Sequence, residues 1–127
     1  MEKETKIIHI ALTYENREEA DIFFNKILGL KLIKSSILSE KLTEEIFKIK
    51  KETVIDVYSN DSSYFEIFIS KVKNKHIFDH ICIKVDDKER FIKKCEENKI
   101  KPICIKKGEK TLLFVKDYAG NLFEVID

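Results

Sequence analysis

Short apolar runs with the two-residue alternation of β-strands follow one another along the chain and are interrupted by segments with helical spacing. In the first half, apolar residues recur at three- and four-residue intervals after Asn16 and stop at Gly29, which predicts a helix between these residues. The strand-like runs of this half are residues 7–12, 30–36, 53–59 and 64–69. The first half is therefore predicted to be β-α-β-β-β, with a hairpin turn over residues 59–63.

The second half repeats this order. Asp86 and Glu89 predict the start of its helix, and residues 117–121 predict a turn before the last strand. The predicted strands are residues 79–85, 101–105, 111–115 and 122–126. Because the order and spacing recur, an internal duplication is the economical interpretation. Residues 38–52 have no counterpart in the second half, and residues 42–47 predict a short helical turn inserted there.

The predicted fold class is α+β, with two tandem βαβββ modules over approximately residues 6–70 and 78–127. A chain of 127 residues, 43% hydrophobic and with few Gly and Pro residues, is expected to form a single domain over residues 1–127. The net charge of +1, with lysines scattered among acids, argues against nucleic-acid binding. The sequence predicts no signal peptide and no membrane span, and it favours a cytoplasmic location.

Four ionisable residues stand inside these apolar runs: His9, Glu66, His80 and Glu124. An unpaired charge buried in such a run is costly, so each of these side chains must reach water or a compensating partner. In each module one histidine lies on the opening strand and one glutamate on the closing strand. This matched placement predicts one shared partner, a divalent metal ion held by all four side chains in a cup formed by a curled mixed sheet.

Two imidazoles and two carboxylates suit zinc, nickel, cobalt, manganese or iron(II), and the two negative charges balance the ion. Four protein ligands leave positions open to substrate oxygens on an ion that accepts six. Cys82 follows His80 by two residues and should line the same cup, where we interpret it as a small buried core residue and not as a ligand.

The chain resembles the vicinal oxygen chelate superfamily, which includes glyoxalase I, methylmalonyl-CoA epimerase, extradiol dioxygenases, and fosfomycin and bleomycin resistance proteins. The resemblance rests on three segments: Ile-His-Ile-Ala-Leu followed by a helix ending in Phe-Phe-Asn-Lys-Ile-Leu-Gly-Leu, Phe-Asp-His-Ile-Cys-Ile-Lys-Val, and Leu-Phe-Val-Lys-Asp-Tyr-Ala-Gly-Asn-Leu-Phe-Glu-Val. It implies two βαβββ modules curled around a metal bound by His9, Glu66, His80 and Glu124.

This ligand set is most similar to that of glyoxalase I, whereas the epimerase usually has Gln at the position of Glu66 and the dioxygenases use only the other three ligands. The resemblance implies a lyase or isomerase, lactoylglutathione lyase-like, that transfers a proton through a metal-bound enediolate with Glu124 and Glu66 as bases. The alternatives are an epimerase of acyl thioesters, an extradiol-type dioxygenase, and a non-catalytic resistance or binding protein. The expected partners are a small-molecule substrate with adjacent oxygens and a second copy of the chain in a homodimer.

Overall fold

The computed structural model describes residues 8–71 and 80–127. The chain divides into two compact units, the first made of Met1–Arg17 and Leu30–Lys73 and the second of Glu18–Gly29 and Asn74–Asp127. The helix predicted for the first module therefore groups with the second half of the chain. The single domain predicted over residues 1–127 stays a prediction.

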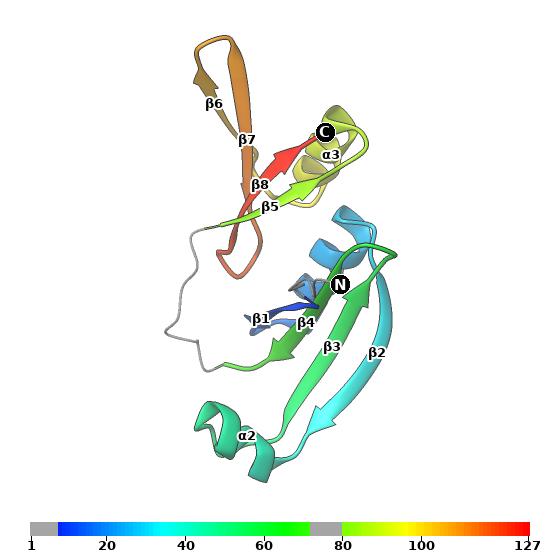
Figure 1. Cartoon of the computed structure of the whole chain (residues 1–127), viewed down its shortest axis with the longest axis vertical. Coiled ribbons are helices and arrows are strands. Elements are labelled where there is room, and N and C mark those ends of the chain that lie inside the picture. Colours follow the sequence, from blue (N-terminus) through cyan, green and yellow to red (C-terminus); the bar gives the residue numbers. More distant parts are fainter. Residues whose placement is uncertain (1–7, 72–79) are drawn as a thin grey trace, which may run out of the picture. The chain divides into compact units, whose positions relative to one another are not determined.

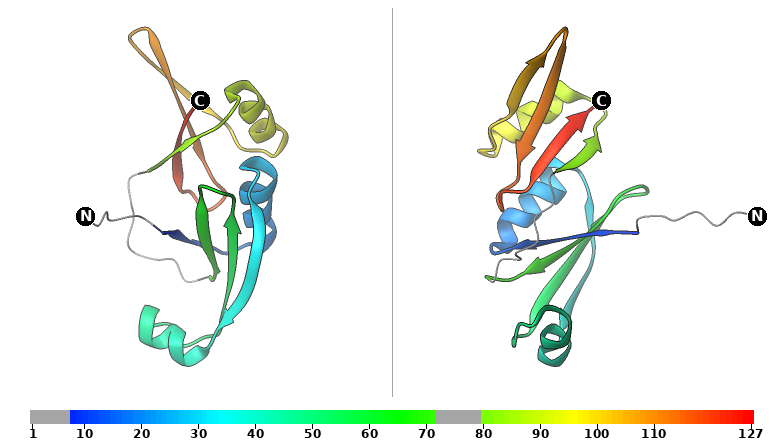
Figure 2. Two further views of the ribbon diagram at one scale, coloured as in Figure 1. Left: turned by 45° about the vertical axis from the view of Figure 1, so that its right-hand side comes forward. Right: turned by 60° about the vertical axis from the view of Figure 1, so that its left-hand side comes forward.

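The first unit is built on a four-stranded sheet with the order β1-β4-β3-β2 (Figure 1). β1 pairs in parallel with β4, and the β2–β3 and β3–β4 pairs are antiparallel. The helix α2 is inserted between β2 and β3, as predicted (Figure 2). The elements are β1 (Ile10–Tyr14), β2 (Lys31–Leu38), α2 (Glu40–Phe47), β3 (Thr53–Ser59) and β4 (Tyr64–Ile69).

The second unit contains a sheet of the same topology, with the order β5-β8-β7-β6. β5 pairs in parallel with β8, while β7 is antiparallel to both of its neighbours. Its own strands and helix are β5 (Ile81–Lys84), α3 (Lys88–Glu97), β6 (Ile103–Lys107), β7 (Lys110–Lys116) and β8 (Leu122–Ile126). The predicted βαβββ order and the α+β class are confirmed, and the two sheets share one strand order.

The helix that precedes β2 is α-helical over α1 (Arg17–Asp21) and continues as a π-helix, η1 (Ile22–Ile27). The amide of Leu28 donates to the carbonyl of Phe23 at 2.9 Å, the i→i+5 bond of that geometry. Gly29 ends the helix with φ of +75°, a value that glycine adopts without a Cβ penalty. In the second unit the ring of Phe23 lies 5.1 Å from the ring of Phe123 on β8.

The start of α3 corrects the sequence interpretation by one residue. The N-cap is Asp87, not Asp86, and its carboxylate accepts a hydrogen bond from the amide of Arg90 at 3.1 Å. Phe91 and Cys95 of this helix are buried. His76, which the sequence places in a solvated link between the modules, lies outside the described residues. The helices within residues 8–71 and 80–127 are too short or too polar to cross a membrane.

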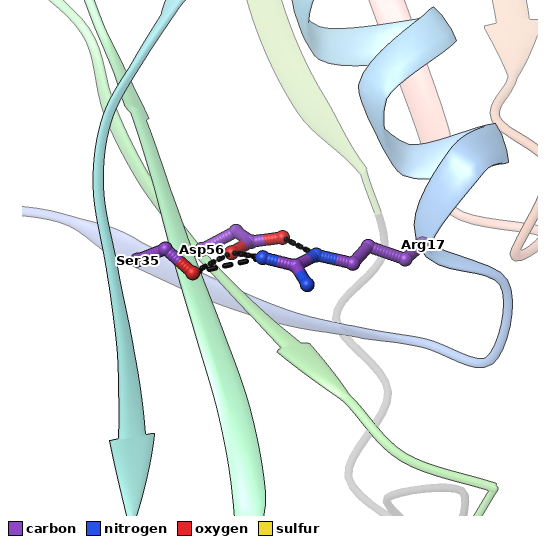
Figure 3. Close-up of polar contacts among 3 residues, drawn as sticks. All are labelled: Arg17, Ser35 and Asp56. Atoms are coloured by element: carbon purple, nitrogen blue, oxygen red, sulfur yellow. Dashed lines mark hydrogen bonds and ion pairs between the residues drawn. The ribbon is translucent and has the colours of Figure 1, made fainter.

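An ion pair between the exposed side chain of Arg17 and the buried carboxylate of Asp56 joins the start of α1 to the middle of the first sheet (Figure 3). Asp56 on β3 is fully buried, and its two carboxylate oxygens accept hydrogen bonds from Arg17 Nε and Nη2 at 2.7 Å each. Ser35 on β2 accepts from Arg17 Nη2 at 2.8 Å and donates to Asp56 at 2.7 Å. The hydrogen bond to Asp56, and then the charge of Asp56, raise the pKa of Arg17 above its usual range. We call these three residues the arginine clamp.

The second unit has no charge at the matching position. Asp56 pairs with Ile67 one position after Glu66, and Leu113 pairs with Val125 one position after Glu124. Leu113 is therefore the counterpart of Asp56 in the duplicated sheet, and it is also buried. The first sheet holds a hydrogen-bonded charge at a place where the same topology accepts an aliphatic side chain.

The arginine clamp should contribute measurably to stability. Arg17→Leu leaves the buried carboxylate of Asp56 without its guanidinium and should lower the free energy of unfolding by about 2–3 kcal/mol, measured by urea denaturation at pH 7. The double substitution Arg17→Leu with Asp56→Leu should recover more than half of this loss, because the second sheet already carries a leucine at that position.

Arg90→Leu in the first turn of α3 is the control, since the exposed side chain of Arg90 has no ion pair among the described residues, and it should change stability by less than about 0.5 kcal/mol. Equal effects of Arg17→Leu and Arg90→Leu would show that the clamp does not stabilise the sheet.

Candidate metal centre

In the first unit, His9 and Glu66 come together because β1 and β4 are parallel neighbours. His9 immediately precedes β1, and Ala11, two residues later, is in register with Glu66. His9 Nε2 lies 3.5 Å from Glu66 Oε1. The histidine side chain is 40% exposed and the glutamate 25%, so both remain accessible to a ligand. We call this pair the first half-site.

The second unit repeats this arrangement with His80 and Glu124, the second half-site. His80 immediately precedes β5, and Cys82, again two residues later, is in register with Glu124 on β8. His80 Nε2 lies 3.4 Å from Glu124 Oε1, with side-chain exposures of 36% and 25%. The two half-sites therefore agree in register, in donor atoms and in separation.

Strand alternation explains why the glutamates remain accessible within apolar runs. The neighbours of Glu66 along β4, Phe65 and Ile67, are buried on the opposite face of the sheet. The neighbours of Glu124 along β8, Phe123 and Val125, are buried in the same way. The apolar residues of each closing strand thus stabilise one face while they hold the carboxylate on the other, as the sequence predicts.

The donor separations suit a metal ion. Zinc binds imidazole nitrogen at about 2.0–2.1 Å and carboxylate oxygen at about 2.0–2.2 Å, so two such ligands at a tetrahedral angle lie about 3.4 Å apart. A direct N–H···O hydrogen bond is shorter, about 2.9 Å. The observed 3.5 Å and 3.4 Å match the wider spacing. Each half-site therefore supplies one nitrogen and one oxygen at a separation that a single divalent ion can bridge.

The structure brings the four predicted ligands together as two pairs, His9 with Glu66 and His80 with Glu124. Within residues 8–71 and 80–127, no group of three or more His, Cys, Asp or Glu side chains is placed to hold a metal ion. The binding of one ion by His9, Glu66, His80 and Glu124 together stays a prediction.

Comparisons with known proteins identify the fold. No protein-family model matches the sequence, and no curated protein matches it. Among solved structures, a glyoxalase family protein from Enterococcus faecalis is 20% identical, with 96% of this chain and 97% of that chain covered and a TM-score of 0.70. A glyoxalase family protein from Bacillus cereus is 13% identical, with 98% and 94% covered and a TM-score of 0.75.

A third similar structure is a mutant of the fosfomycin resistance protein FosX from Listeria monocytogenes, complexed with Mn(II) and 1S,2S-dihydroxypropylphosphonic acid. It is 13% identical, with 98% and 93% covered and a TM-score of 0.73. This chain has the vicinal oxygen chelate fold. The resemblance inferred from the sequence motifs is thus confirmed at the level of fold.

In this vicinal oxygen chelate fold, the turn before β8 holds the closing strand of the second half-site in place. Asp117 is buried, and its carboxylate accepts hydrogen bonds from the amides of Ala119 at 3.1 Å and Asn121 at 2.7 Å. The side-chain amide of Asn121 donates to the other carboxylate oxygen at 2.8 Å. These three hydrogen bonds to the Asp117 side chain fix the turn between β7 and β8. They therefore fix where β8 begins and where Glu124 lies along it.

Cys82 corrects the sequence interpretation, because its side chain is exposed and not a buried core residue. Cys82 is in register with Glu124 on β8, so it lies on the same accessible face of the sheet as that carboxylate. Partial loss of hydration, and then the negative charge of Glu124, raise the pKa of Cys82 above its usual range. This favours the neutral thiol over the thiolate that metal binding requires.

The arginine clamp is the buried polar group that the sequence reasoning missed. Arg17 appears in the sequence as one of two arginines near helix starts, and Asp56 as a polar residue in a strand. Asp56 lies on the face of β3 opposite to its neighbour Val57, which is in register with Glu66. Arg17 therefore binds a side chain on the other face of the sheet from the first half-site, and it supplies no ligand-binding charge there.

The Asp117 turn predicts a local loss of stability. Asp117→Ala removes these three hydrogen bonds and leaves their amide donors without this acceptor, so we expect a loss of about 2 kcal/mol in urea denaturation. Asp61→Ala is the control, because Asp61 is exposed in the turn between β3 and β4. If the two variants unfold at the same urea concentration, the turn does not depend on Asp117.

Proposed function

We propose that this protein is a divalent-metal-dependent enzyme of the glyoxalase I type, with His9, Glu66, His80 and Glu124 as the metal ligands. The observation that carries the proposal is the repetition of one nitrogen–oxygen pair, at 3.5 Å and 3.4 Å, in the same register of two duplicated sheets. A chance pairing of a histidine with a glutamate has no reason to recur at equivalent positions in both units.

The solved structures with the same fold support a metal. One of them, FosX, was determined with Mn(II) and a dihydroxypropylphosphonic acid, a small molecule with several oxygens. For this chain the candidate ions are zinc, nickel, cobalt, manganese and iron(II), since imidazole and carboxylate donors bind all of them. The expected substrate is a small molecule with two adjacent oxygens.

The chemistry we propose is proton transfer next to a carbonyl group. A divalent ion at this site would act as a Lewis acid toward the two substrate oxygens and make the neighbouring C–H group more acidic. Glu124 would accept the proton from the substrate carbon and return it to the adjacent carbon, and Glu66, its counterpart in the first half-site, would be the base on the other face of the substrate. Both carboxylates are partly exposed on the face opposite to the buried apolar residues, as a base that must reach substrate requires.

Glu66 separates this proposal from two of the alternatives. A dioxygenase would leave Glu66 without a role, and the epimerases usually carry Gln at the corresponding position. The closeness of Glu66 to His9 makes it a donor equivalent to Glu124, which favours the four-ligand set.

A second candidate is a resistance protein, because solved structures of FosX share the fold over 98% of this chain. Its distinguishing measurement is growth of bacteria that express the protein in the presence of fosfomycin. Protection that survives Glu66→Gln would favour this candidate over the glyoxalase type.

We also propose that the protein forms a homodimer. The outer strands β2 and β6 carry exposed apolar side chains, which a second copy could cover. They are Leu32, Ile33, Ile37, Ile103 and Ile105.

Metal binding is the first test of the proposed function. One ion per chain should bind, and at about 100 times the dissociation constant it should raise the melting temperature by about 10 °C. His9→Ala and His80→Ala should each abolish most of this shift for nickel, cobalt, zinc and manganese, because both half-sites supply ligands.

His76→Ala replaces the remaining histidine, which is not a predicted ligand, and it should retain the full shift. A wild-type protein whose melting temperature does not respond to any of these ions would rule out the metal site.

Proton transfer by Glu124 is the second test. Glu124→Gln should slow exchange of the α-proton of a probe substrate, the hemithioacetal of methylglyoxal and glutathione, by at least about 100-fold in heavy water, because the amide cannot accept the proton. NMR measures the exchange, and elemental analysis confirms that the variant still holds metal.

Glu109→Gln in the exposed β6–β7 turn is the matched control and should exchange at the wild-type rate. Unchanged exchange in a metal-loaded Glu124→Gln variant would contradict the role of Glu124.

A further inference from the structure

The first half-site contains a third side chain that the metal does not require. Tyr64 lies on β4 two residues before Glu66, so both project from the same face of the strand. Its ring centroid lies 5.9 Å from the imidazole centroid of His9, and the two ring planes are inclined at 39°. Tyr64 is half-buried, as Glu66 is. An aromatic side chain with a polar end thus packs beside His9 and shares the strand face of Glu66.

The phenol hydroxyl of Tyr64 is available to a ligand. Among the residues that the structure describes, it has no hydrogen-bond partner. The hydroxyl of Tyr118, by contrast, donates to the carbonyl of Asn98 at 2.6 Å. A hydroxyl on a ring that lies next to a candidate metal ligand, with no hydrogen-bond partner among the described residues, can donate its proton to a bound molecule.

At the equivalent strand position, the second half-site carries an aliphatic side chain and no hydroxyl. Leu122 stands two residues before Glu124, at the place that Tyr64 holds before Glu66. The ring next to His80 is instead Phe114 of β7, at a centroid distance of 6.0 Å and in an edge-on orientation. Of these two rings, Tyr64 beside His9 carries a proton donor and Phe114 beside His80 does not. The duplication is symmetric in its candidate ligands and asymmetric in this one functional group.

A hydroxyl at the first half-site alone would bind the two oxygens of a ligand differently. A molecule with two adjacent oxygens, one of them anionic, is bound more tightly when the anionic oxygen accepts a hydrogen bond, because charge-assisted hydrogen bonds are the stronger ones. We propose that Tyr64 is a specificity-determining residue whose O–H donates to the anionic oxygen of such a ligand at the first half-site, while its ring orients the imidazole of His9. This inference rests on the proposed function, since the ligand is expected to bind at the metal.

The two roles of Tyr64 predict different effects for two substitutions. Tyr64→Phe keeps the ring beside His9 and removes only the hydroxyl, so metal affinity should stay at the wild-type value. Tyr64→Leu removes the ring as well and should weaken metal binding. A residue that serves only to pack would show no difference between wild type and Tyr64→Phe in any measurement.

The experiment uses the full chain loaded with nickel and titrates acetohydroxamate, a small probe with two adjacent oxygens of which one becomes anionic. Calorimetry first measures the dissociation constant of the metal and then that of acetohydroxamate. Tyr64→Phe should weaken acetohydroxamate binding by about tenfold at unchanged metal affinity, which is the effect of one hydrogen bond to a charged acceptor. Tyr118→Phe removes a phenol hydroxyl that is already bonded within the protein, and it should bind the probe as wild type does.

The outcomes separate the two proposals. If nickel binds and Tyr64→Phe binds acetohydroxamate as tightly as wild type, the role of Tyr64 is overturned and the metal site stands. If nickel-loaded wild type does not bind acetohydroxamate, the recognition of adjacent oxygens is overturned and with it the role of Tyr64. If wild type does not bind nickel, cobalt, zinc or manganese, both the proposed function and this inference fail.

Discussion

The candidate metal centre depends on the parallel pairing of the first and last strands within each sheet. β1 and β4 are separated by two other strands in the chain, and so are β5 and β8, yet each pair lies side by side. Parallel neighbours require a crossover connection, and the intervening strands supply it. Because the same register recurs in both sheets, each histidine that precedes an opening strand stands beside a glutamate in the middle of a closing strand. A shift of one residue would turn the glutamate to the buried face.

Much of this arrangement could be predicted from the sequence, because strand alternation shows both which side chains are buried and which face the carboxylate occupies. Phe65 and Ile67 flank Glu66 in an alternating run, so burial of the apolar pair leaves the carboxylate on the accessible face. β3, β4 and β8 have the predicted bounds, and the inserted helix lies within residues 38–52. The repeated order of strands and helices was sufficient to predict a duplicated fold.

The remaining features depend on contacts that sequence patterns do not carry. Arg17 and Asp56 are 39 residues apart, and nothing near either one indicates that they meet. The π-helical geometry of η1 has no distinct spacing over so short a segment. Cys82 occupies an apolar run of a kind usually buried, but it lies on the accessible face of the sheet beside Glu124, so its side chain is exposed. In each case the feature depends on tertiary contacts, which the local sequence does not determine.

The difference between Asp56 and Leu113 affects how the two repeats fold. Duplicated modules can exchange strands during folding, because their sequences fit the same topology. If β3 entered the second sheet, the carboxylate of Asp56 would be buried among apolar residues. Its partner Arg17 would not be there to pair with it. That error carries the full desolvation cost of an unpaired charge, whereas the native arrangement does not. Asp56 thus disfavours the exchange of its strand into the second sheet and favours pairing of each strand within its own module.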